Sequence, residues 1–183
     1  MIRSLYRAEG EDKREATAEA KRFANRAWEI LRGWKGVPGQ HPDGTIDGEK
    51  LEDWVRAARF AFEESGHVSV GDEQIGELLS ASPLGRDNIW PAEEVREIIE
   101  ATGNVRLETG LQIGLFNRRG VTSRSPYEGG TQERALQEKY HQMSVTLAPK
   151  WRRTSRVLGA IAENFGREAR REDDDAKRQA DRE

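Results

Sequence analysis

The feature that most constrains this chain is the spacing of its apolar residues, which recur at steps of three and four along most of its length. Residues 12–34 and residues 48–65 each carry one such stripe between charged positions. This spacing collects the apolar side chains on one face of a helix. Strand-like alternation is confined to residues 67–70, a segment too short to found a sheet. The sequence therefore predicts an all-α fold.

Length and composition limit how much of the chain can be buried. The chain has 183 residues, of which 35% are hydrophobic and 34% are charged, against a charged share of about 25% in typical domains. This allows one modest core. We expect a single compact domain of six or seven amphipathic helices over residues 12–166, with a polar extension at residues 1–11. Residues 167–183 form a charged tail that is either a helical extension or frayed.

Capping residues and prolines suggest where several helices begin. The Gly- and Pro-rich segment 36–44 separates the first two helices, and Asp47 is placed to cap the second. We expect these helices to form an antiparallel hairpin that buries Trp28 and Trp54 in one cluster. The pattern also predicts three later helix starts, with Asp72 and Thr131 as N-caps and Pro91 as a first helical residue.

Two glycines one turn apart, Gly110 and Gly114, lie inside a helix predicted over residues 105–118. Glycine in the interior of a helix lowers its stability. The close approach of a neighbouring helix would compensate for this cost. The sequence therefore predicts a tight helix–helix contact at this position.

The composition gives no support to catalysis, cofactor binding or membrane insertion. The chain contains no cysteine, and its three histidines lie on separate segments without metal-ligand spacing. No apolar run approaches the length of a membrane span, and no leader segment follows Met1. Acidic runs such as Glu93-Glu94 and residues 173–175 are typical of solvated surfaces. We expect a soluble, cytoplasmic protein that is not an enzyme, with no cofactor and no metal.

Residues 39–50 partly resemble a calcium-binding loop, because Asp43, Gly44 and a following isoleucine match the second half of that pattern. In this alignment Gly39, His41 and Lys50 occupy positions that should provide oxygen ligands. The substitutions remove three ligands and add a cation. The sequence therefore favours an ordinary turn before a helix rather than a calcium site.

Charge is distributed unevenly along the chain. Residues 103–156 carry 10 basic and 4 acidic side chains, whereas residues 1–102 carry 14 basic and 21 acidic ones. Within the basic segment, nine residues form the candidate site for a partner or an anion: Arg118, Arg119, Arg124, Tyr127, Lys150, Trp151, Arg152, Arg153 and Arg156. Arginines beside a helix start offer donors to an anionic group, and aromatic rings offer stacking surfaces.

Three interpretations of this basic segment stay open. Its arginines pair internally with the acidic helices of residues 1–102, or they contact a partner protein, or they bind nucleic acid. An isoelectric point near 5.8 and the lack of a recognition-helix motif argue against nucleic acid. Tryptophans at helix ends, such as Trp90 and Trp151, favour a protein interface. We expect a non-catalytic interaction or regulatory module that binds another protein, with a nucleic-acid-binding module that uses residues 118–156 as the alternative.

Overall fold

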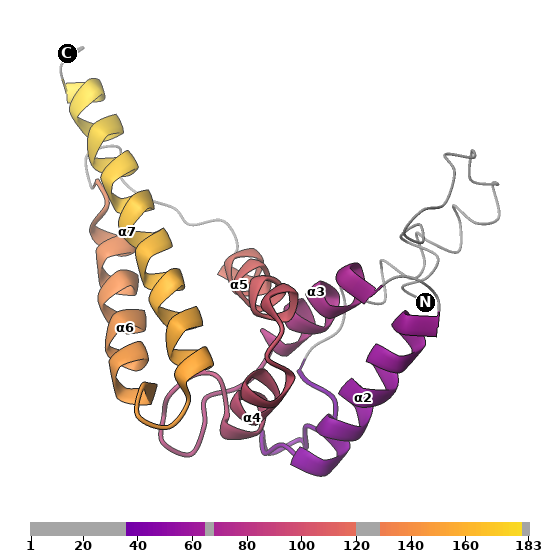
Figure 1. The fold of residues 1–183 in the computed structure, drawn as a ribbon. Coiled ribbons are helices and arrows are strands. Elements are labelled where there is room, and N and C mark those ends of the chain that lie inside the picture. Colours follow the sequence, from indigo (N-terminus) through magenta and orange to yellow (C-terminus); the bar gives the residue numbers. More distant parts are fainter. Residues whose placement is uncertain (1–35, 65–67, 120–128, 181–183) are drawn as a thin grey trace, which may run out of the picture. The chain divides into compact units, whose positions relative to one another are not determined.

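The computed structural model describes residues 36–64, 68–119 and 129–180, and these residues form an all-α structure (Figure 1). Within them there is no strand, and one isolated antiparallel bridge joins Gln40 to Ile46. The all-α prediction with six or seven helices is thus confirmed. The helix predicted over residues 12–34, with Trp28, lies outside the described residues. The six helices are α2 (Gly48–Glu64), α3 (Val68–Leu79), α4 (Glu93–Thr102), α5 (Val105–Arg119), α6 (Thr131–Leu147) and α7 (Arg152–Ala180).

These helices divide into two compact units. The first unit holds the described residues up to Ile98 together with Asn104–Leu115, and the second holds Ile99–Gly103 and the described residues from Phe116 onward. The ends of α4 and α5 therefore belong to the second unit. Each unit is described by itself below.

Helix α2 begins where its sequence predicts. The Asp47 side chain accepts a hydrogen bond of 3.1 Å from the backbone N–H of Lys50, as an N-cap residue does. The helix buries Leu51 and Val55, and its Phe62 ring covers Gly71 of α3, where a Cβ would lie 2.2 Å from the ring. Trp54 is partly exposed. Its predicted cluster with Trp28 stays a prediction, because Trp28 lies outside the described residues.

The tightest contact in the first unit is the crossing of α3 and α5. A Cβ added at Gly110 would lie 1.9 Å from the carbonyl oxygen of Glu73, and one at Gly76 would lie 2.0 Å from that of Leu107. At Gly114 the corresponding distance to the carbonyl oxygen of Glu77 is 2.7 Å. Real Cβ atoms essentially never approach other atoms this closely, so the two backbones meet where side chains are absent. The close approach predicted from the two glycines of α5 is confirmed, and Gly76 extends it onto α3.

Three predicted helix starts are wrong. Helix α3 begins at Val68, so Asp72 lies inside it and is buried, where its carboxylate accepts hydrogen bonds from Arg59 and Asn104. Helix α4 begins at Glu93, two residues after Pro91. Helix α6 has Gly130 as its N-cap residue, so Thr131 is its first helical residue rather than its cap. In the first case a tertiary contact of the carboxylate takes the place of the local cap.

The second unit is built on the antiparallel pair α6 and α7, which lie side by side in Figure 1. The rings of Tyr140 and Phe165 stack at 5.7 Å between their centroids, and the Ser144 hydroxyl donates to the carbonyl oxygen of Ser155 over 2.7 Å. At the other end of the pair, the Asp173 carboxylate accepts the N–H of Gly130 over 2.9 Å. The two helices are therefore tied together at both ends.

Helix α7 continues through Gly166 to Ala180 without interruption. Of the two alternatives for the charged tail, the helical extension is the one observed as far as Ala180. Ala169 is buried against the start of α6, and Asp173 also forms an ion pair of 2.6 Å with Arg134. Asp173 is therefore part of the packing of α6 and α7 rather than one of a run of solvated charges.

Candidate functional site

Five of the nine candidate residues lie in the turn between α6 and α7 and at the start of α7. They are Lys150, Trp151, Arg152, Arg153 and Arg156. Helix α6 ends at Leu147 and α7 begins at Arg152. The backbone N–H groups of Lys150 and Trp151 both donate to the carbonyl oxygen of Leu147, over 3.1 and 2.8 Å. Trp151 is the N-cap residue of α7, because its carbonyl oxygen accepts the N–H of Ser155 over 2.9 Å. The basic turn, which we define as Lys150–Arg156, is therefore fixed by its own backbone.

A carboxylate from α4 caps the beginning of α7. Glu100 accepts hydrogen bonds from the backbone N–H groups of Arg153 and Thr154, over 3.1 and 2.8 Å, and from the Thr154 hydroxyl over 3.0 Å. These N–H groups are the donors that make a helix N-terminus an anion site. In this protein an internal anion binds them. An external anionic group at the basic turn would therefore be held by side chains.

The side chains of the basic turn differ in how far they reach into solvent. Lys150, Arg152 and Arg156 are exposed, and the Lys150 ammonium lies 3.9 Å from the centroid of the Trp151 ring. Trp151 is partly exposed. The Arg153 guanidinium lies over Gly103, where an added Cβ would lie 3.2 Å from the Arg153 Nη2 atom. The turn therefore presents cations around an accessible indole ring.

The position of these cations is unfavourable for α7 itself. Arg152, Arg153 and Arg156 lie in its first two turns, and its first turn carries no acidic residue. Positive charge near a helix N-terminus opposes the helix dipole, at a typical cost of about 0.3–1 kcal/mol per charge. Glu100 offsets part of that cost through its two backbone hydrogen bonds. The helix dipole of α7 therefore does not favour arginines at this end.

Arg119 belongs to the candidate residues at the end of α5, and its side chain pairs with other residues of the second unit. Its guanidinium pairs with the buried carboxylate of Glu133 and with Glu168 at 3.4 Å, and it lies 5.3 Å from the centroid of the Phe165 ring. The internal interpretation of the basic segment predicted partners within residues 1–102, whereas both carboxylates lie later in the chain. Arg118 is exposed at the end of α5. Arg124 and Tyr127 lie outside the described residues.

The turn that resembles a calcium loop is held by its own hydrogen bonds. The Asp43 carboxylate accepts the N–H and the hydroxyl of Thr45, over 2.9 and 2.7 Å, and these bonds lower the pKa of Asp43. Among the residues that the structure describes, no group of three or more His, Asp or Glu side chains is placed to hold a metal ion. His41 and His141 are exposed, and His67 lies outside the described residues.

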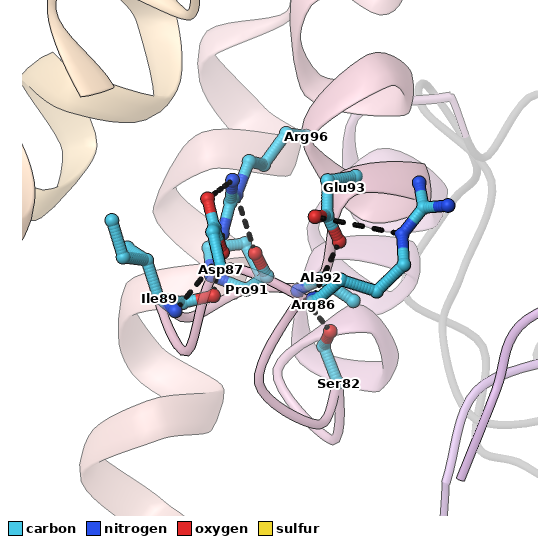
Figure 2. Close-up of polar contacts among 8 residues, drawn as sticks. All are labelled: Ser82, Arg86, Asp87, Ile89, Pro91, Ala92, Glu93 and Arg96. Carbon is cyan, nitrogen blue, oxygen red and sulfur yellow. Dashed lines mark hydrogen bonds and ion pairs between the residues drawn. The ribbon is translucent and has the colours of Figure 1, made fainter. Parts of the chain in front are cut away.

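The sequence did not reveal the buried arginine that organises the loop before α4. Arg96 is fully buried and forms two hydrogen bonds with the Asp87 carboxylate, over 2.6 and 2.8 Å (Figure 2). It also donates to the carbonyl oxygens of Pro91, over 2.6 Å, and Ile89. The hydrogen bonds from Arg96 hold the pKa of Asp87 below its ordinary value. The sequence does contain a sign of this burial. Arg96 follows Ala92 by four residues, and this spacing places it on the apolar face of the helix that becomes α4.

Comparison of this chain with protein-family models, with curated proteins and with solved structures finds no match. None of the helices in the described part of the chain is long and apolar enough to cross a membrane. Function must therefore be inferred from the geometry of the sites.

Proposed function

We propose that the chain is a non-catalytic module that binds another protein, and that the basic turn contacts an acidic surface of that partner. The observation that carries this proposal is the exposure of Lys150, Arg152 and Arg156 on the same short segment as the partly exposed Trp151, with the Lys150 ammonium 3.9 Å from the centroid of the Trp151 ring. Arginine and tryptophan are the residue types most enriched at the energetic centres of protein interfaces. Their unfavourable position for the α7 dipole is consistent with a role in binding.

The contact depends on side chains rather than on the helix backbone. Because Glu100 binds the N–H groups of Arg153 and Thr154, the partner's carboxylates would meet the Arg152 and Arg156 guanidinium groups. Arginine matches a carboxylate with two parallel hydrogen bonds. The Trp151 ring adds apolar area beside these charged contacts, with the Lys150 ammonium against its face.

A protein partner is favoured over nucleic acid by the charges around the turn. Glu100 places a carboxylate at the point where a phosphate would meet the helix N-terminus. The whole chain has a formal net charge of −3, whereas nucleic-acid-binding domains are typically basic overall. Nucleic-acid binding by the same turn is a possible outcome of the test below.

The test compares two labelled probes of matched charge, an acidic peptide and an oligonucleotide with as many phosphates as the peptide has carboxylates. One is a peptide of about ten residues that alternates glutamate with leucine, and the other is a single-stranded oligonucleotide. Fluorescence anisotropy measures both affinities at about 50 and about 200 mM salt. We expect saturable peptide binding that is tighter than oligonucleotide binding at the higher salt concentration. Tighter oligonucleotide binding with a steep salt dependence would replace the proposal by the nucleic-acid alternative.

A pair of double variants locates the binding surface. Arg152→Glu combined with Arg156→Glu should weaken peptide binding by at least about tenfold, as expected for the loss of contacts at the centre of an interface. Arg170→Glu combined with Arg171→Glu makes the same charge change at exposed positions later in α7. This control should stay within about twofold of the wild type. Equal losses in both variants would show that net charge, rather than the basic turn, determines binding.

A further inference from the structure

The first unit contains a cavity of about 600 Å³ that is separate from the basic turn. It is lined by the turn at residues 43–46, the loop at residues 83–86 and the start of α4. Its apolar lining comes from Ile46, Pro83, Leu84 and Ala92. Leu84 is 52% exposed, although it lies in a loop whose backbone is fixed. An apolar side chain held at the mouth of a cavity offers a contact surface for an apolar group from outside.

The polar lining of this cavity is mainly acidic. Asp43, Glu93 and Glu94 contribute three carboxylates, and Arg86 contributes one guanidinium. The hydrogen bonds from Thr45 lower the pKa of Asp43, which favours its ionised form. Glu93 accepts the backbone N–H of Arg86 over 3.1 Å and lies 3.7 Å from its guanidinium, as Figure 2 shows. The lining therefore carries an excess of negative charge and is complementary to a cationic group.

The loop wall of the cavity is held in place by the network around Arg96. Arg96 binds Asp87 and the carbonyl oxygens of Ile89 and Pro91, which fixes the part of the loop that leads into α4 (Figure 2). The Ser82 hydroxyl accepts the N–H of Ala92 over 2.9 Å and closes the loop at its base. A wall ordered before binding reduces the entropy that a ligand must overcome.

The opposite wall is ordered in a similar way. The turn at residues 40–46 is closed by the bridge between Gln40 and Ile46 and by a hydrogen bond of 2.8 Å from the His41 N–H to the Thr45 carbonyl oxygen. The Gly44 N–H donates to the carbonyl oxygen of His41 over 3.0 Å. Both walls are thus held by hydrogen bonds within the protein.

We propose that this cavity binds a peptide segment of a partner protein in which an apolar side chain stands next to lysine or arginine. The apolar side chain would pack against Leu84, Pro83 and Ile46, while the cation would face Asp43 and Glu94. This site is independent of the basic turn, and its ligand has the opposite charge to the surface that the turn would bind.

The test uses a labelled peptide of about ten residues that alternates lysine with leucine, with the same fluorescence anisotropy readout. Two matched peptides replace every lysine by glutamine or every leucine by serine. The full chain should bind the lysine–leucine peptide saturably and at least about tenfold more tightly than either matched peptide. Failure to bind it, or equal binding of the serine-containing peptide, would overturn the proposal.

Variants of the chain then assign the binding to the cavity. Glu94→Lys should weaken binding by at least about tenfold, and Leu84→Ser should weaken it by about threefold or more. Glu97→Lys is the matched control, because Glu97 is exposed one turn later on α4 and lies outside the lining. It should stay within about twofold of the wild type. A loss with Glu97→Lys equal to that with Glu94→Lys would mean that the peptide follows net charge alone, and the cavity would not be its site.

Discussion

Two helix pairs of this protein, one in each unit, are held together in different ways. In the first unit, α3 and α5 cross so closely that the positions of Gly76 and Gly110 have no room for a side chain. In the second unit, side chains make the contacts along the middle of α6 and α7, with Tyr140 stacked on Phe165 and Ser144 bonded to Ser155. The two backbones approach closely near the start of α6, where a Cβ at Gly130 would lie 2.2 Å from the carbonyl oxygen of Ala169. Glycines occur in α7 as well, but a Cβ at Gly159 would meet only the Ser144 hydroxyl oxygen, at 3.4 Å.

This difference shows that a glycine within a helix can have two distinct consequences. Where backbones touch, glycine permits the contact, and any larger residue must push the helices apart. Where space remains, glycine only adds freedom to the unfolded chain and lowers helix stability. Substitution by alanine should therefore change stability in opposite directions at Gly110 of α5 and at Gly159 of α7.

The largest effect is expected for Gly110→Ala. Its Cβ would lie 1.9 Å from the carbonyl oxygen of Glu73, an atom of the α3 backbone that cannot rotate away. We expect a loss of about 3–4 kcal/mol in the free energy of unfolding, measured by urea denaturation. The control is Gly159→Ala, which should raise stability by about 0.5–1 kcal/mol. Destabilisation of similar size in both variants would contradict the comparison.

A smaller effect is expected for Arg119→Ala in the second unit. This change leaves the Glu133 carboxylate, which is 1% exposed, without its pairing guanidinium. Removal of one partner from a buried ion pair is costly, and because Arg119 is itself partly exposed we expect about 2–3 kcal/mol by the same measurement. Arg170→Ala, at an exposed position of α7, should stay within about 0.5 kcal/mol. Equal small effects would show that Arg119 has no structural role.

The smallest effect is expected for the pH dependence of stability in the second unit, through the carboxylate of Asp173. The Gly130 N–H and the Arg134 side chain hold the pKa of Asp173 below its ordinary value. A carboxyl whose pKa is lower in the folded state stabilises the fold above the unfolded pKa, about 3.9, and loses this contribution as the pH falls through the folded value. Asp173→Asn should lower the thermal midpoint by a few degrees at pH 7 and flatten its decline below about pH 4. Asp174→Asn should do neither; an unchanged acid profile in Asp173→Asn would exclude this role.

Local signals allowed part of the fold to be predicted from the sequence. Asp47 caps the helix directly after it, and the spacing of Gly110 and Gly114 predicts a close helix–helix contact. Asp72 was misjudged because its acceptor groups bind Arg59 and Asn104, which are distant in the chain. A capping pattern read from a few neighbouring residues gives no information about a partner that is distant in the chain.

The candidate sites divide in the same way. A cluster of basic residues around Trp151 is visible in the sequence, whereas the role of Glu100 at the start of α7 depends on a contact across more than fifty positions. Arg119 and Arg152 are alike in the sequence, yet only the structure shows Arg119 paired with Glu133 and Arg152 exposed. The cavity beside Leu84 is formed by segments about forty residues apart, and no local pattern announces it.

The proposed role of the basic turn is tested most directly by observing Trp151 itself during binding. The chain is labelled with 5-fluorotryptophan, the Trp151 signal is assigned through Trp151→Phe, and fluorine NMR follows a titration with the glutamate–leucine peptide. We expect the Trp151 signal to shift saturably while the signals of Trp54 and the buried Trp90 keep their positions. Saturable binding of the peptide with no change at Trp151 would contradict the assignment of the partner surface to the basic turn.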